Sequence, residues 1–252
     1  MEFLLVGGAF FAAMLGAISG LGGGIYVMPL LIHVYGQTYS HSGLTTVSLV
    51  VVLVNSISSL FWGRQIQYVD MKFAKPIAMI SAVGSLLGLW LQRQVSRDTF
   101  ELYLAILLTI LGVYLFFKAA AADRQCSNEP AKFENRDGAI SFAIGAMASF
   151  FGIGGGLIQV PYLVYFRDRP VKQATATSQV MLGAVAFVAL SVSLLGLRVS
   201  VPWTAIGVMA PAAVLGGVTG SRLSAKLKGA WIIRILSILL LFLAYRVSMR
   251  VL

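Results

Sequence analysis

The sequence predicts an all-α polytopic membrane protein made of two inverted repeats, each with a glycine-broken re-entrant helix pair and three transmembrane helices. Of its 252 residues, 58% are hydrophobic and only 11% are charged, whereas a soluble domain carries about 25% charged residues. The mean hydropathy is +0.87. This composition excludes a soluble enzyme, a disordered chain and a secreted disulfide scaffold.

Eight apolar stretches, bounded by charges and turn residues, are the candidate membrane segments. They run over residues 3–35, 43–62, 73–91 and 100–117, and then over 139–166, 174–195, 203–223 and 231–245. Several approach the ~20 residues with which a helix crosses a bilayer, and alternating strands of the outer-membrane type are absent from the sequence. Segments 3–35 and 139–166 each hold a run of glycines, and each is long for one helix but short for two full spans.

The two glycine-containing stretches begin an internal repeat. Residues 15–31 match residues 147–163 at an offset of 132, with Gly-Leu-Gly-Gly-Gly at 20–24 and Gly-Ile-Gly-Gly-Gly at 152–156. At the same offset Thr45-Thr46 aligns with Thr177-Ser178. We therefore expect repeat 1 at 1–117, a solvated linker at 118–138 and repeat 2 at 139–252, a duplication typical of secondary transporters.

The distribution of basic residues predicts the topology. If each glycine-broken stretch returns to its own side of the membrane, 14 of the 19 Lys and Arg residues lie on one face, and that face is the cytoplasmic one. If each stretch is a single crossing, the bias disappears. We therefore predict a multi-pass protein of the cell inner membrane with both termini outside and the linker inside. Two full spans per stretch give the same parity, but the arms beside the glycines are short for spans.

The glycine runs are the strongest candidates for a binding site. Glycine adopts φ > 0 and permits the close approach of a backbone or a ligand, and the arm that follows each run begins a helix whose free N–H groups favour an anion. The candidate substrate-binding glycines are Gly22, Gly23, Gly24, Gly154, Gly155 and Gly156. The alternative is helix packing through small residues.

Polar side chains near the glycine runs extend the candidate site. The hydroxyls of Thr45, Thr46, Thr177 and Ser178 would donate to an oxyanion, or they would only cap their helices or bond back to the preceding turn. Gln159 is an amide in an apolar run, just after the glycines, which is costly without a partner. We predict that it contacts the ligand.

Other chemistry lacks candidate residues in the sequence. All nine acidic residues lie at segment ends or in loops, and no catalytic constellation or metal-ligand spacing occurs, so we expect no catalytic residue, metal or cofactor. The net charge of +10 is spread over many short loops, which favours membrane topology over nucleic-acid binding. The expected partners are a small anionic substrate and the lipid bilayer, and the sequence leaves the oligomeric state open.

The duplicated G-[LI]-GGG-x-x-x-x-P-x-L element, the Thr-Thr/Ser pair after it and the chain length resemble the TauE/SafE family of sulfite and organosulfonate exporters. The resemblance covers nearly the whole chain. It implies an inner-membrane carrier that exports a small sulfur-containing oxyanion such as sulfite, thiosulfate or an organosulfonate. The alternatives are a structural or accessory membrane subunit without transport activity, and a membrane-embedded enzyme acting on lipid.

Overall fold

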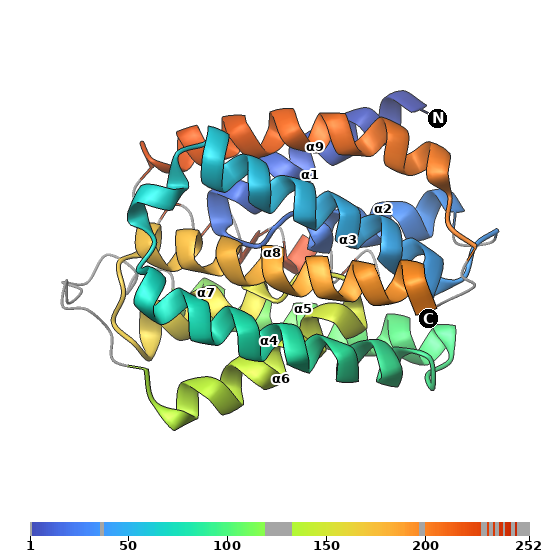
Figure 1. Ribbon diagram of the computed structural model, residues 1–252. Coiled ribbons are helices and arrows are strands. Elements are labelled where there is room, and N and C mark those ends of the chain that lie inside the picture. Colours follow the sequence, from blue (N-terminus) through green and yellow to red (C-terminus); the bar gives the residue numbers. More distant parts are fainter. Residues whose placement is uncertain are drawn as a thin grey trace.

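The computed structural model describes residues 2–35, 38–118, 133–196 and 200–227, and scattered positions between 231 and 245. Over this part of the chain the secondary structure is helical (Figure 1). Within it, four helices are long and apolar enough to cross a membrane: His41–Trp62, Met71–Gln92, Val171–Leu195 and Trp203–Ser224. The predicted class, an all-α polytopic membrane protein, is confirmed. Most of the expected linker and much of the expected helix 231–245 lie outside the described residues.

The described part of the first half contains seven helical elements. They are α1 (Glu2–Ser19), α2 (Gly24–Tyr35), α3 (His41–Ile57), the π-helical turn η1 (Ser58–Trp62), the 3-10 turn η2 (Gln65–Tyr68), α4 (Met71–Gln92) and α5 (Arg97–Lys118). Helices α3, α4 and α5 begin slightly before the expected segments because their first turns are polar. Ser40 caps α3 by accepting a bond from the Gly43 N–H, and Asp70 caps α4. Such caps satisfy N–H groups that the helix leaves free.

The described part of the second half contains α6 (Asn135–Phe151), α7 (Gly156–Tyr165), α8 (Val171–Gly196) and α9 (Trp203–Ser224). Helix α6 begins at Asn135, within the last residues of the segment 118–138 that the sequence predicts as a linker. The cause is a capping box, in which the Glu134 side chain accepts from the backbone of Asp137 and Asp137 accepts from the backbone of Glu134. This reciprocal pair starts the helix one turn before its apolar run.

The helices form three layers in Figure 1, with α9 and α1 at the top, α3 and α8 in the centre, and α4 and α6 at the bottom. Glycines set the two outer contacts. A Cβ on Gly216 of α9 would lie 2.3 Å from the Phe10 carbonyl oxygen of α1, and one on Gly84 of α4 would lie 2.2 Å from that of Phe142 in α6. The two contacts are related by the repeat offset, as are those of Gly220 with Met14 and Gly88 with Ala146. Small residues let membrane helices approach closely.

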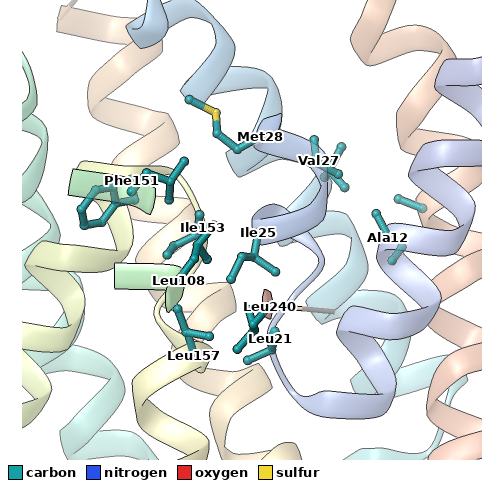
Figure 2. Packing of buried hydrophobic residues seen from close by; sticks show 14 of the residues in the cluster. Ala12, Leu21, Ile25, Val27, Met28, Leu108, Phe151, Ile153, Leu157 and Leu240 are labelled. Atoms are coloured by element: carbon teal, nitrogen blue, oxygen red, sulfur yellow. The ribbon is translucent and has the colours of Figure 1, made fainter. Parts of the chain in front are cut away.

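The core between the two glycine-broken helix pairs is apolar (Figure 2). Leu21 and Ile25 come from the first pair and Leu108 comes from α5. Their counterparts at the repeat offset, Ile153, Leu157 and Leu240, pack in the same cluster, and all six side chains are buried. The two halves therefore contribute matching residues to one shared core, which places the two glycine runs next to each other.

Candidate functional site: two opposed glycine-broken helix pairs

The two glycine runs end their helices in the same way. The N–H groups of Leu21 and Gly22 both donate to the Gly16 carbonyl, and those of Ile153 and Gly154 both donate to the Ala148 carbonyl. Such paired bonds satisfy the last carbonyls of a helix and require left-handed residues. Positive φ occurs at Gly20, Gly22, Gly23, Gly152, Gly154 and Gly155. The last three are the counterparts of the first three at the repeat offset, so the repeat extends to the backbone conformation.

After the turn, the chain runs back along the helix it has just left. A Cβ on Gly16 would lie 2.1 Å from the backbone nitrogen of Gly23, and one on Gly23 would lie 2.9 Å from the Ala12 carbonyl oxygen. Helix α2 therefore begins beside the middle of α1, as Figure 2 shows. The first arms have 18 and 17 residues and the second arms 12 and 10. The sequence predicts first arms of about 16 residues or fewer, below the ~17-residue minimum of a membrane span, and the observed first arms reach that minimum while the second arms stay below it.

The starts of α2 and α7 lie against the opposite glycine run. A Cβ on Gly24 would lie 2.8 Å from the Gly152 carbonyl oxygen, and one on Gly156 would lie 2.2 Å from the Gly20 carbonyl oxygen. Gly22, Gly23 and Gly24 are buried, and so are Gly154, Gly155 and Gly156. The structure therefore brings together all six glycines that the sequence singled out, in the interior of the protein.

Hydroxyl groups bind the carbonyls that would otherwise repel an anion. Ser178 Oγ donates to the Gly20 carbonyl at 2.8 Å, and Ser48 Oγ donates to the Gly152 carbonyl at 2.6 Å. In the described part of the chain no backbone acceptor binds the N–H groups of Gly24, Ile25 or Leu157. Because these N–H groups start helices, they carry the positive end of the helix dipole. The arrangement has the electrostatics of an anion site.

The hydroxyls of α3 and α8 do not follow the constant repeat offset. Thr45 packs on Gly152, but Thr175 packs on Gly20, so Thr45 corresponds in space to Thr175 and not to Thr177. Ser48 and Ser178 keep the same spacing. The predicted alignment of Thr45-Thr46 with Thr177-Ser178 is therefore wrong, because the residues of α8 that occupy equivalent places in the structure come two positions earlier in the sequence. Helix α7 is shorter than α2, with 10 residues against 12, and this shifts the following helix.

The predicted polar residues have different environments. Thr46 Oγ1 donates to the Ser42 carbonyl at 2.9 Å within its own helix. Thr45 Oγ1 accepts from Gln92 Nε2 at 2.7 Å, so its own hydrogen remains able to donate. Thr177 is buried in α8 with 2% of its surface exposed. Gln159 is fully buried, and neither its Nε2 nor its Oε1 has a partner.

Sequence reasoning missed three residues that organise the site. Thr175 and Ser48 contact the glycine runs directly, and a search for the repeat at an offset of 130 would have found both. Gln92, at the end of α4, donates to Thr45 and also to the Phe150 carbonyl at 2.8 Å. It is far from Thr45 in the sequence, and no local pattern indicates the contact.

A network of ion pairs and hydrogen bonds joins the start of α6 to the end of α7. Asp137 is fully buried, although the sequence predicted it in a solvated linker. Its carboxylate accepts from the Tyr162 hydroxyl and from the Glu134 backbone N–H, and it lies 3.3 Å from Arg167 Nε. The Arg167 guanidinium also donates to Glu134 at 2.7 Å, which holds the pKa of that carboxyl below its ordinary value. Arg167 in turn stacks over Phe73 of α4. Together these partners replace the water that Asp137 loses on burial.

Comparison with known proteins places the chain in a family. The model of the family described as "Sulfite exporter TauE/SafE" matches residues 5–247. The chain belongs to the TauE/SafE family. The protein named "Probable membrane transporter protein YunE" of Bacillus subtilis is 25% identical over 92% of both chains. A Xylella fastidiosa protein named "Probable membrane transporter protein" is 28% identical over 84% of this chain and 79% of its own length.

A third relative, "Probable membrane transporter protein MJ0441" of Methanocaldococcus jannaschii, is 30% identical over 69% of this chain and 66% of its own length. No solved structure matches the chain. Among the described residues no group of three or more His, Cys, Asp and Glu side chains is placed to hold a metal ion. Family membership and the four membrane-length helices together make this a membrane protein of a transporter family.

Proposed function

We propose that this TauE/SafE protein is a secondary transporter that exports a small sulfur-containing oxyanion, such as sulfite, thiosulfate or an organosulfonate. The observation that carries the proposal is the direct packing of the two glycine runs. Each places the start of one short helix against the other run, at Gly24 on Gly152 and at Gly156 on Gly20. Broken helices that meet inside a membrane protein are typical of substrate sites in secondary transporters.

The charge distribution supports weak, reversible binding. No Lys or Arg occurs in residues 3–62 or 139–166, so the anion would meet helix N-termini rather than a cation. Each terminus contributes roughly 0.3–2 kcal/mol to anion binding, and the repeat supplies two. A midplane arginine would cost at least ~2.5 kcal/mol on insertion and would hold an oxyanion more tightly than a carrier needs.

The side chains have separate roles in this proposal. The N–H groups of Gly24, Ile25 and Leu157 bind the anion, together with the free hydroxyl hydrogen of Thr45 and the amide of Gln159. The other glycines of Gly22–Gly24 and Gly154–Gly156 shape the turns around it, since the N–H groups of Gly22, Gly154 and Gly156 already donate to backbone carbonyls. Thr177 lines the site from α8. Thr46 and Ser178 do not bind the anion themselves and have structural roles, because their hydroxyls already donate to the carbonyls of Ser42 and Gly20. The Ser178 hydroxyl keeps α8 in place against the first glycine run, whereas the Thr46 hydroxyl stabilises the first turn of α3 itself.

The topology belongs to the same proposal. The two halves would be inverted repeats, with both termini outside the inner membrane and 14 of the 19 basic residues on the cytoplasmic face. Matching contacts at the repeat offset, such as Gly84 on Phe142 and Gly216 on Phe10, support the duplication. Alternating access would then come from movement of one repeat against the other around the paired glycine runs.

Anion-dependent thermal stability of the purified protein tests the function. Sulfite, thiosulfate, sulfoacetate, sulfate and chloride are compared at equal concentration, and a bound anion raises the melting temperature because it binds only the folded state. We expect the sulfur oxyanions to stabilise and chloride to have little effect. If no anion shifted the melting temperature, the protein would be better described as an accessory subunit.

A pair of threonine variants connects the binding to the site. Thr45→Ala and Thr177→Ala should each weaken anion affinity about five-fold and together about thirty-fold, since each lost hydrogen bond contributes about 1 kcal/mol. Thr219→Ala is the matched control, because the Thr219 hydroxyl donates within α9 to the Leu215 carbonyl, away from the glycine runs. Unchanged affinity in the double variant would remove these hydroxyls from the site.

A further inference from the structure

Gln159 is a buried amide without a hydrogen-bond partner. It is fully buried, and both its Nε2 and its Oε1 lack a partner. Two other buried glutamines, Gln179 in α8 and Gln92 in α4, are bonded. Gln179 donates to the Gly16 carbonyl and accepts from Ser56, and Gln92 donates to Thr45 and Phe150. A buried amide that binds nothing destabilises the fold, so this side chain requires an explanation.

The position of Gln159 connects it to the glycine run of the second half. It lies one turn after Gly156, and its backbone N–H donates to the Gly155 carbonyl. Its counterpart at the repeat offset is Val27, an apolar residue that is also fully buried and faces Ala12 of α1 (Figure 2). The fold therefore tolerates a wholly apolar side chain here in one half, and packing alone does not demand an amide in the other.

We infer that Gln159 is a specificity-determining subsite for an anion that carries its own hydrogen-bond donor. This inference rests on the proposed function. The amide Nε2 would donate to an oxygen of the anion, and Oε1 would accept from a hydroxyl or acid hydrogen of the same ligand. Both unpaired atoms are satisfied only by a ligand with an acceptor and a donor. The class is a monoanion such as hydrogensulfite or a hydroxylated sulfonate.

The charges around the site favour the same class. The only charged side chains that are buried among the described residues are Glu101, Asp137 and Arg169, and none of them belongs to a glycine run or to α2 or α7. A dianion would enter this site without a cation to compensate its second charge, and its oxygens would face the lone pairs of Oε1. A monoanion with a hydrogen avoids both costs.

Two sulfonates that differ by one hydroxyl test the inference. Isethionate and ethanesulfonate share the sulfonate group and the two-carbon chain, but only isethionate has a hydroxyl. The wild-type protein should bind isethionate about ten-fold more tightly than ethanesulfonate, the effect of one buried hydrogen bond. Gln159→Met keeps the length of the side chain and removes both polar atoms, and we expect the two affinities to become equal. Affinities are measured by thermal-shift titration.

The ligand-free proteins provide a second readout and a matched control. Gln159→Met should keep or raise the melting temperature because it removes an unsatisfied buried amide, whereas Gln179→Met should lower it because it breaks two bonds. A drop in Gln159→Met as large as that in Gln179→Met would overturn the inference, since the amide would then have a structural partner such as a buried water.

The outcomes separate this inference from the proposed function. If sulfur oxyanions stabilise the wild-type protein but isethionate and ethanesulfonate bind equally, the transporter proposal stands and the role of Gln159 is refuted. The role is also refuted if Gln159→Met retains the wild-type preference. If no sulfur oxyanion stabilises the protein, both proposals fail.

Discussion

Replacement of Gly156 by alanine should force the two glycine runs apart. The added Cβ would lie 2.2 Å from the Gly20 carbonyl oxygen and 2.9 Å from both Leu21 Cα and Ser178 Oγ. Carbon and oxygen in ordinary contact are more than about 3 Å apart, so backbone must move by about 1 Å. Overpacking of this kind costs about 1–3 kcal/mol, and a lost bond from Ser178 to Gly20 adds about 1 kcal/mol. We expect Gly156→Ala to destabilise the protein by roughly 2–4 kcal/mol.

The assay compares thermal unfolding of detergent-purified Gly156→Ala with that of Gly207→Ala. Gly207 lies in α9, where a Cβ would meet nothing within 4 Å. Alanine there should leave stability unchanged or raise it by up to about 1 kcal/mol through helix propensity. The Gly156 variant should melt several degrees lower and lose transport in proteoliposomes, because the start of α7 is displaced from its counterpart.

The reasoning is refuted if Gly156→Ala melts and transports like Gly207→Ala. That result would mean that the glycine runs separate easily, so that their contact does not define the site. Loss of stability with normal transport would also contradict it, because the position of the α7 start would then be irrelevant to binding.

Valine at Gly23 or Gly155 should abolish transport while the protein still reaches the membrane, because both residues have positive φ and a β-branched side chain resists it; normal transport would reduce the turn to a packing device. Cys126, in the predicted cytoplasmic linker, should resist an impermeant thiol reagent in intact cells, and labelling from outside would reverse the topology. Asp137→Ala should destabilise the protein by about 3 kcal/mol because it leaves the buried Tyr162 hydroxyl without its acceptor and removes one of the two carboxylates that pair with Arg167. The control Arg136→Ala, at an exposed surface, should cost under about 1 kcal/mol, and equal melting temperatures of the two variants would show that the ion network is not structural.

The sequence determined the helical membrane class, most helix positions and the glycine turns. The composition shows whether a folded chain has enough polar side chains to form a surface in contact with water, and this chain has too few. The glycine requirement is equally local, because a left-handed residue is costly for any other side chain. That is why six glycines at matching repeat positions, from Gly20 to Gly155, adopt positive φ in the structure, and why the glycine runs could be singled out in advance.

The ends of the helices were less predictable. Hydrophobic segments mark where a helix enters lipid, but the capping residues outside the lipid decide where it begins. Asp70 and Glu134 both start helices before the apolar run. The early start of α6 then carries Asp137 into the interior, where Tyr162 and Arg167 pair with it. No charge count of the linker could have indicated that burial.

Only the tertiary structure decided which hydroxyls and amides meet the glycine runs. Each residue turns a helix by about 100°, so the difference in length between α2 and α7 changes which face of the next helix turns inward. This is why Thr175 rather than Thr177 corresponds to Thr45. The contact of Gln92 with Thr45 likewise depends on how α4 packs near α3, which the local sequence does not encode. The tertiary structure also distinguishes Gln179, whose amide is hydrogen-bonded, from Gln159, whose amide has no partner. Two amides in apolar runs look alike in the sequence, and they differ because partners depend on neighbouring helices that local patterns do not encode.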